Sequence, residues 1–175
     1  MPDNPLWMFR PFLSPAPLPL EVISQLQEPM KALQMWLFFS LLLVGAIFDC
    51  QKRLIPNTLC ALITMVGLLV FHPAQLMGPL AALPLLAAAM HKPGSIGGGD
   101  IKFTAASGFV LGITDGLWGM ALGLALAALF YAINWSTQKF RRRKCAAPSQ
   151  TALPLVPFLS LGFAIIYILN YGGTL

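Results

Sequence analysis

The chain is poor in charged residues. Only 10% of its 175 residues are charged and 57% are hydrophobic, whereas about 25% of residues are charged in a typical soluble domain. This composition excludes an ordinary soluble globular protein and indicates an integral membrane protein. We expect an all-α, polytopic membrane protein with about six transmembrane helices, and the length allows one compact bundle.

Cysteine and histidine are also scarce. The three cysteines, Cys50, Cys60 and Cys145, form no C-x-x-C pair and are odd in number, so they imply neither a zinc site nor a complete set of disulfides. His72 and His91 stand at the ends of apolar segments, which favours loop or interfacial roles. The chain has no H-E-x-x-H motif, and no Ser-His or Cys-His arrangement stands out. We therefore expect no metal and no cofactor.

The first 30 residues are rich in proline, at positions 2, 5, 11, 15, 17, 19 and 29. Proline lacks the amide donor and breaks regular helices, so this segment is not expected to cross a membrane. It also lacks the order of a signal peptide. We expect an extended or interfacial extracytoplasmic arm over residues 1–30 and a transmembrane domain over residues 31–175.

Apolar segments predict six membrane spans. They run over about Leu33–Phe48, Asn57–Phe71, Leu76–Met90, residues 102–115, Leu117–Trp135 and Leu153–Tyr171. Pro56 and Asn57 suit the start of the second helix, and Pro79 and Pro84 are candidate kinks in the third. The fourth segment is the weakest, because a span usually needs about 20 apolar residues and shorter ones are often re-entrant or buried.

The basic residues decide whether the fourth segment crosses. The net charge is +5, but Lys and Arg stand in short loops beside apolar segments, which fits membrane topology better than nucleic-acid binding. If the segment crosses, one side holds Lys52, Arg53, Lys92, Lys102, Lys139, Arg141, Arg142, Arg143 and Lys144, and the other only Arg10 and Lys31. Because Lys and Arg stay cytoplasmic, we predict six spans, three cytoplasmic loops and both termini outside the cytoplasm.

An aspartate follows three glycines in the segment Gly97-Gly98-Gly99-Asp100. An acidic residue at membrane depth is by default a candidate functional residue. The glycines remove side-chain bulk and permit unusual backbone conformations, so an extended substrate could approach the carboxylate. The segment matches neither phosphate-binding glycine motif. The alternative is a helix-packing loop without chemistry.

Asp49 closes the first span and Asp100 opens the fourth, so the topology places both at the same depth on the cytoplasmic side. Two close carboxylates cannot both ionise cheaply, so a charged one could activate water while a protonated one donates to a peptide oxyanion. In the alternative, each only caps a helix. Asp115 falls at the far face and is expected to be a helix-start residue. Lys102 is most simply a topology determinant.

Three stretches resemble the type IV prepilin peptidase family, whose members are membrane aspartyl proteases with a G-x-G-D motif. The first is Gly97-Gly98-Gly99-Asp100-Ile101-Lys102, which is similar to the family's G-G-G-D-[IVL]-K. The second is Asp49 followed by Arg53-Leu54-Ile55-Pro56-Asn57, which is similar to its first-aspartate loop. The third, from Pro154 to Gly162, resembles a stretch in the last part of family members, but has Leu155-Val156 where they often have Phe-Gly.

The resemblance implies that Asp49 and Asp100 are the catalytic pair of an aspartic endopeptidase in the bacterial inner membrane. It implies a type IV pilin-like precursor as substrate, cut at the cytoplasmic face between a short basic leader and a hydrophobic segment. Longer members carry C-x-x-C motifs and also N-methylate the new terminus; here we expect only peptidase activity, as in short relatives that serve tight-adherence pili or secretion systems. The surrounding residues expected to meet substrate are Gly97, Gly98, Gly99, Lys102, Pro56 and Asn57.

Two other functions remain open at this point. Buried carboxylates beside a glycine-interrupted helix also occur in ion-coupled carriers, although the chain has no convincing internal repeat. A non-enzymatic subunit of a pilus or secretion machine would keep the fold without the cleavage. The bilayer is the expected environment in every case, nucleic acid is not an expected partner, and the sequence does not decide whether the chain forms a homodimer.

Overall fold

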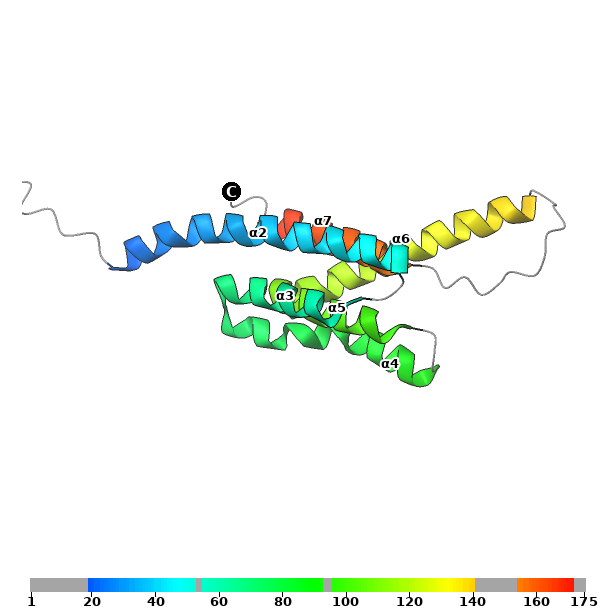
Figure 1. Cartoon of the computed structure of the whole chain (residues 1–175), viewed down its shortest axis with the longest axis horizontal. Coiled ribbons are helices and arrows are strands. Elements are labelled where there is room, and N and C mark those ends of the chain that lie inside the picture. Colours follow the sequence, from blue (N-terminus) through cyan, green and yellow to red (C-terminus); the bar gives the residue numbers. More distant parts are fainter. Residues whose placement is uncertain (1–18, 53–54, 93–95, 141–153, 172–175) are drawn as a thin grey trace, which may run out of the picture.

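The regular structure is helical throughout the part of the chain that the computed structural model describes, which comprises residues 19–52, 55–92, 96–140 and 154–171. The elements are α2 (Pro19–Lys52), α3 (Asn57–Gly67), η2 (Leu68–Val70), η3 (Pro73–Ala82), α4 (Leu83–His91), α5 (Gly98–Leu111), α6 (Ile113–Phe140) and α7 (Val156–Tyr171). Figure 1 shows them lying side by side along one common direction. The all-α prediction is confirmed.

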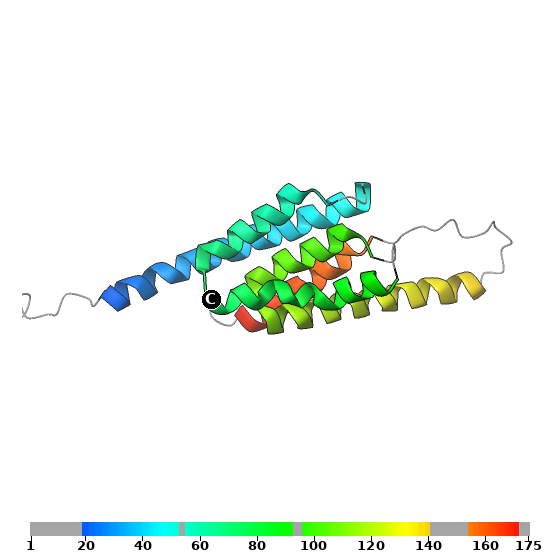
Figure 2. The same cartoon turned by 90° about the horizontal axis from the view of Figure 1, so that it is seen from below.

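The helices alternate in direction, so their ends gather at the two ends of the bundle (Figures 1 and 2). One end holds the C-termini of α2 and α4 and the N-termini of α3, α5 and α7. The opposite end holds the junction of η2 with η3, the junction of α5 with α6, and the C-terminal part of α7. Asp49 and Asp100 lie at the first end, which we call the aspartate end.

Three helical stretches are long and apolar enough to cross a membrane: Pro29–Lys52, Pro73–His91 and Ile113–Ser136. Two shorter apolar helices are Asn57–Val70 and Val156–Asn170. These five correspond to five of the six predicted spans. The third is a 3-10 helix that contains Pro79 and becomes an α-helix at Leu83. Kinks at Pro79 and Pro84 stay predictions. The number of crossings and the sidedness of the bundle stay predictions.

Helix α2 begins earlier than the sequence predicts. It starts at Pro19 and continues through Pro29 to Lys52, so residues 19–30 are helical and not extended. The interfacial, extracytoplasmic placement of this segment stays a prediction. Proline is tolerated at the first helical position because its missing N–H would have no helical partner there. Residues 20–28 contain no further proline to interrupt the helix. The prediction for residues 1–18 concerns residues outside the described part of the chain.

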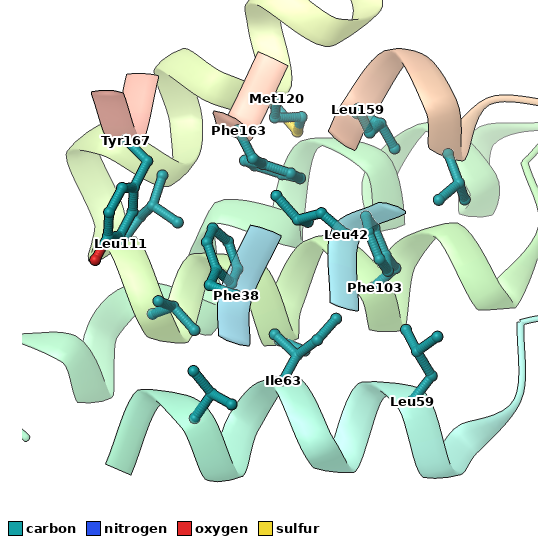
Figure 3. Packing of buried hydrophobic residues seen from close by; sticks show 14 of the residues in the cluster. Phe38, Leu42, Leu59, Ile63, Phe103, Leu111, Met120, Leu159, Phe163 and Tyr167 are labelled. Carbon is teal, nitrogen blue, oxygen red and sulfur yellow. The ribbon is translucent and has the colours of Figure 1, made fainter. Parts of the chain in front are cut away.

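Helix α5 is enclosed by the other helices. It packs against η3, α3, α6 and α7, and all residues from 106 to 111 are buried, as are Phe103 and Thr104. Figure 3 shows the core around it, whose labelled members are Phe38, Leu42, Leu59, Ile63, Phe103, Leu111, Met120, Leu159, Phe163 and Tyr167. Because α5 faces protein on most sides, its 14 residues need less apolar length than a lipid-facing span.

Glycines allow the tightest helix contacts. A Cβ on Gly162 of α7 would collide with the carbonyl oxygen of Gly119 and lie 2.6 Å from the backbone nitrogen of Gly123, both on α6. A Cβ on Gly78 of η3 would collide with the carbonyl oxygen of Gly108 on α5. Small residues let membrane helices approach closely where lipid provides no hydrophobic driving force between them. Glycine therefore brings both α7 and η3 against their neighbours.

We expect Gly162→Ala to lower the free energy of unfolding by about 1–3 kcal/mol, because an added methyl group would force α6 and α7 apart. The measurement is thermal unfolding of the purified protein in detergent. Gly98→Ala is the matched control, since a Cβ at Gly98 meets nothing within 4 Å. Equal melting temperatures for the two variants would contradict the close contact.

Candidate functional site

Asp49 lies three residues before the end of α2 and is only 6% exposed. Its Oδ2 accepts a hydrogen bond of 3.0 Å from the backbone N–H of Val156, the first residue of α7. The first N–H groups of a helix have no partner within the helix and favour a negative charge nearby. The N-terminus of α7 therefore holds a carboxylate that the apolar bundle would otherwise leave without a partner.

Ser160 connects the same turn of α7 to α2. Its hydroxyl lies 2.7 Å from the carbonyl oxygen of Val156 and 3.3 Å from that of Leu42. The Ser160 side chain is buried, so these contacts fix the turn against the helix that carries Asp49. No role was assigned from the sequence to the stretch from Pro154 to Gly162, which contains this turn. A signal was nevertheless present, because a proline-flanked helix start can serve as the donor to a buried carboxylate.

Asp100 lies in the first turn of α5, and its backbone N–H donates to the carbonyl oxygen of Gly97 at 3.1 Å. The residue is partly buried. Its carboxylate is close enough to Asp49 for the two negative charges to interact. The structure thus brings together two acidic residues that are 51 positions apart in the sequence, at one end of the bundle.

The segment that follows α2 packs on the segment that contains Asp100. Lys102 Nζ donates a hydrogen bond of 3.1 Å to Asn57 Oδ1 at the start of α3. A Cβ on Gly99 would lie 3.1–3.3 Å from the Ile55 side chain, so glycine at this position lets the two segments approach. Pro56 precedes α3 as its N-cap in extended conformation. Lys102 therefore has a specific hydrogen-bond partner. From the sequence, Lys102 was interpreted most simply as a determinant of topology, and this contact was not predicted.

The glycines before Asp100 do not adopt unusual backbone conformations. Gly97 has φ −69° and ψ 138°, which any residue can adopt, and Gly98 and Gly99 belong to the first turn of α5. Among the described glycines, only Gly112 has a positive φ. The expectation that these glycines supply special backbone geometry is therefore wrong. A Cβ on Gly97 would approach Asp100 Oδ2 to 3.2 Å, so the absence of side chains leaves room beside the carboxylate.

Asp115 and the two histidines do not join this site. Asp115 lies in the first turn of α6, at the opposite end of the bundle, as predicted. His72 is the N-cap of η3 at that end, and His91 is the last residue of α4. In the described part of the chain, no group of three or more His, Cys, Asp or Glu side chains could hold a metal ion. Cys145 falls outside that part.

Two interacting carboxylates at one site can perform acid–base chemistry without a metal. When close carboxylates share a proton, one can accept a proton from water and the other can donate one to a developing oxyanion. The described geometry holds one carboxylate through α7 and mounts the other on the first turn of α5. Gly97, which lacks a side chain, leaves space beside the Asp100 carboxylate. These are the parts that hydrolysis of a peptide bond would need.

The chain is similar in sequence to known proteins. A model of the type IV leader peptidase family matches residues 36–136, which include both aspartates and the segments around them. The chain is also similar to the prepilin leader peptidase/N-methyltransferase of Bacillus subtilis, at 30% identity over 148 residues. That match covers 79% of this chain and 55% of the relative, so the chain spans about half the relative's length. No solved structure matches the chain.

The hydrogen bond between Lys102 and Asn57 can be tested on the purified protein without substrate. We expect a double-mutant cycle with Lys102→Met and Asn57→Ala to give a coupling energy of about 0.5–1.5 kcal/mol, because each single change removes the same bond. The measurement is unfolding in detergent. Lys92→Met is the control, since Lys92 is an exposed cation at the same end of the bundle. It should show no coupling to Asn57.

Proposed function

Because the chain belongs to the type IV leader peptidase family, we propose that it is a membrane-embedded aspartic endopeptidase in which Asp49 and Asp100 are the catalytic pair. The observation that supports this proposal is the placement of the two aspartates at one end of the bundle, one on α2 and one on α5, close enough for their charges to interact. The proposed substrate is a type IV pilin-like precursor, from which the enzyme removes a short basic leader.

The proposed place of cleavage is the cytoplasmic face of the bacterial inner membrane. Both aspartates lie at the end of the bundle where α2 and α4 end and α3, α5 and α7 begin. Lys52, Lys92 and Lys102 belong to these same helix ends, and positive residues favour the cytoplasmic side. A precursor with a hydrophobic segment in the bilayer and a leader in the cytosol would present its scissile bond at this depth.

In the proposed mechanism, the charged carboxylate takes a proton from a water molecule, and the water oxygen attacks the scissile carbonyl carbon. The protonated carboxylic acid donates its proton to the carbonyl oxygen. Collapse of the tetrahedral intermediate breaks the C–N bond, and the leaving amine receives the proton that the first carboxylate had accepted. One hydroxyl of the intermediate returns its proton to the second carboxylate, which restores the pair. The products are the leader with a free carboxylate and the mature protein with a new amino terminus.

The proposed activity is limited to peptide-bond cleavage. The name of the Bacillus subtilis relative includes an N-methyltransferase activity, whereas we propose peptidase activity alone for this chain, without S-adenosylmethionine, zinc or another cofactor. The carrier and assembly-subunit alternatives predict no cleavage. The comparisons favour a peptidase over both, and no contact in the described bundle favours either alternative specifically.

The first test is leader removal in membranes. We expect the full chain, co-expressed with a pilin-like precursor, to shorten that precursor, and we expect Asp49→Asn and Asp100→Asn each to reduce the rate by at least about 10³-fold, since each removes a group that moves a proton. Cleavage is followed by gel shift, and the cut position by mass spectrometry. Asp115→Asn is the matched control, because Asp115 lies at the other end of the bundle.

Cleavage that survives both the Asp49 and the Asp100 substitution would refute the aspartic mechanism. We expect Asp115→Asn to cleave at the wild-type rate. If all three variants lost cleavage, the cause would be a general effect on the structure. Failure of the wild-type chain to cleave any pilin-like precursor would favour the carrier or the assembly subunit.

A second test concerns the amide of Val156. We expect Val156→Pro to lower kcat roughly 10- to 100-fold with little change in KM, because it removes the N–H that holds the Asp49 carboxylate, and a hydrogen bond to a charged group contributes about 1.5–3 kcal/mol. Proline suits the first position of a helix. Val156→Ala is the control, because it keeps the amide and loses part of the side chain. Equal kcat values for the two variants would contradict a positioning role for this amide.

A further inference from the structure

A second polar site lies at the end of the bundle opposite to the aspartates. It is a cavity of about 530 Å³, within the range of roughly 300–1,000 Å³ that small-ligand sites occupy. Its lining comes from α2, from the turn before η3, from the junction of α5 with α6, and from α7. Four separate parts of the chain therefore converge on one volume that the proposed peptidase chemistry does not use.

One mostly buried polar side chain in this cavity has no hydrogen-bond partner among the described residues. Gln34 of α2 is 5% exposed, and its amide makes no hydrogen bond to any described residue. Gln75 in the same lining is different, because its Nε2 donates to Val110 O at 3.3 Å and its Oε1 accepts from His72 N at 3.0 Å. The Gln34 amide is not among the fully enclosed unpaired polar atoms of the described residues, so it reaches the cavity, where water or a polar ligand can pair with it. Gln34 therefore marks a place where a polar ligand would gain a hydrogen bond.

Groups of both charges line the same cavity. Asp115 makes no ion pair or hydrogen bond with the described residues, so its carboxylate is available to a cation. Gly112, Ile113 and Thr114 also belong to the lining and lead into α6, and the first N–H groups of a helix attract anions. Lys31 adds a positive charge. A ligand with an anionic and a cationic group side by side would match this lining.

We propose that this cavity binds the headgroup of a zwitterionic phospholipid that carries a primary ammonium, with the ammonium on Asp115 and the phosphate at the start of α6 and near Gln34. The position fits a lipid. Gln34 and Asp49 are fifteen residues apart on α2, which corresponds to about 22 Å at 1.5 Å per residue. With Asp49 near one membrane face, Gln34 falls close to the other, since the hydrocarbon layer is about 30 Å thick.

The surroundings of the cavity are suited to acyl chains. Large apolar side chains near it are exposed on the outer surface of the helices, among them Leu33 and Trp36 of α2 and Leu76 and Met77 of η3. The cavity walls themselves include Met35, Val70 and Ile113. Acyl chains of a lipid seated by its headgroup would therefore continue along apolar protein surface, which a small soluble zwitterion could not use.

The experiment measures the melting temperature of the delipidated full-length protein in detergent, with added phosphatidylethanolamine or phosphatidylglycerol of identical acyl chains. We expect phosphatidylethanolamine to raise the melting temperature by about 5 °C more at saturating concentration, because a ligand that binds only the folded state stabilises it. Native mass spectrometry of the wild-type protein with both lipids in competition should show the same preference. That comparison needs no variant to fold.

Two variants locate the site, and two more serve as controls. Asp115→Asn should abolish the preference for phosphatidylethanolamine, and Gln34→Leu should weaken lipid binding roughly tenfold or more. Gln51→Leu is the matched control, because Gln51 is an exposed glutamine on the same helix at the aspartate end. The preference should also persist in Asp49→Asn, which separates this proposal from the proposed peptidase function.

Equal effects of the two lipids on the wild-type protein would overturn the proposal. A preference that persists in both Asp115→Asn and Gln34→Leu would also overturn it, because the lipid would then bind elsewhere. Glycerophosphoethanolamine, which has the headgroup but no acyl chains, provides the last arm. If it stabilises the protein as well as the lipid does, the occupant is a soluble zwitterion and the lipid assignment is wrong.

Discussion

The hydrogen bond from the Val156 N–H to Asp49 Oδ2 joins residues 107 positions apart and holds a carboxylate inside an apolar bundle. A buried charge needs a partner, because desolvation without one costs far more than a helix bundle of this size can spare. The partner here is the start of a helix, so the position of α7 and the position of Asp49 depend on each other. The packing of α7 on α2 and α6 consequently determines where one of the two aspartates stands.

That packing in turn depends on residues without side chains. Gly162 on α7 faces Gly119 and Gly123 on α6, and Gly78 on η3 faces Gly108 on α5. These contacts draw four helical elements close enough for Phe103 and Phe163 to meet inside the core, with ring centroids 6.4 Å apart (Figure 3). With α5 fixed in the centre, its first turn places Asp100 within electrostatic reach of Asp49. The site is thus a consequence of close helix packing at one end of the bundle.

The sequence predicted the helical class, the common end of the two aspartates and six apolar spans, five of which correspond to apolar helices. These features follow from hydropathy, proline and charge, which are local signals. The signal for α5 was weaker, since a helix enclosed by protein needs neither the length nor the uniform apolarity of a span that faces lipid. The early start of α2 was missed because proline is tolerated at the first helical position, where Pro19 stands, and because α2 continues through Pro29 in its interior. The role of Val156 was also missed. Every residue other than proline carries a backbone N–H, so the residue type does not mark this donor, and its acceptor is 107 residues away in the sequence.

The role of the glycines before Asp100 was also not predictable from the sequence alone. Their pattern before Asp100 was expected to supply unusual backbone geometry, yet Gly97 has an ordinary extended conformation and Gly99 lies beside Ile55. A run of glycines has two uses, conformational freedom and close approach, and only a neighbour in space distinguishes them. Here the neighbour comes from the segment after Asp49. The two motifs are therefore parts of one contact, in which Ile55, from the segment after the first aspartate, packs beside Gly99, the residue before the second.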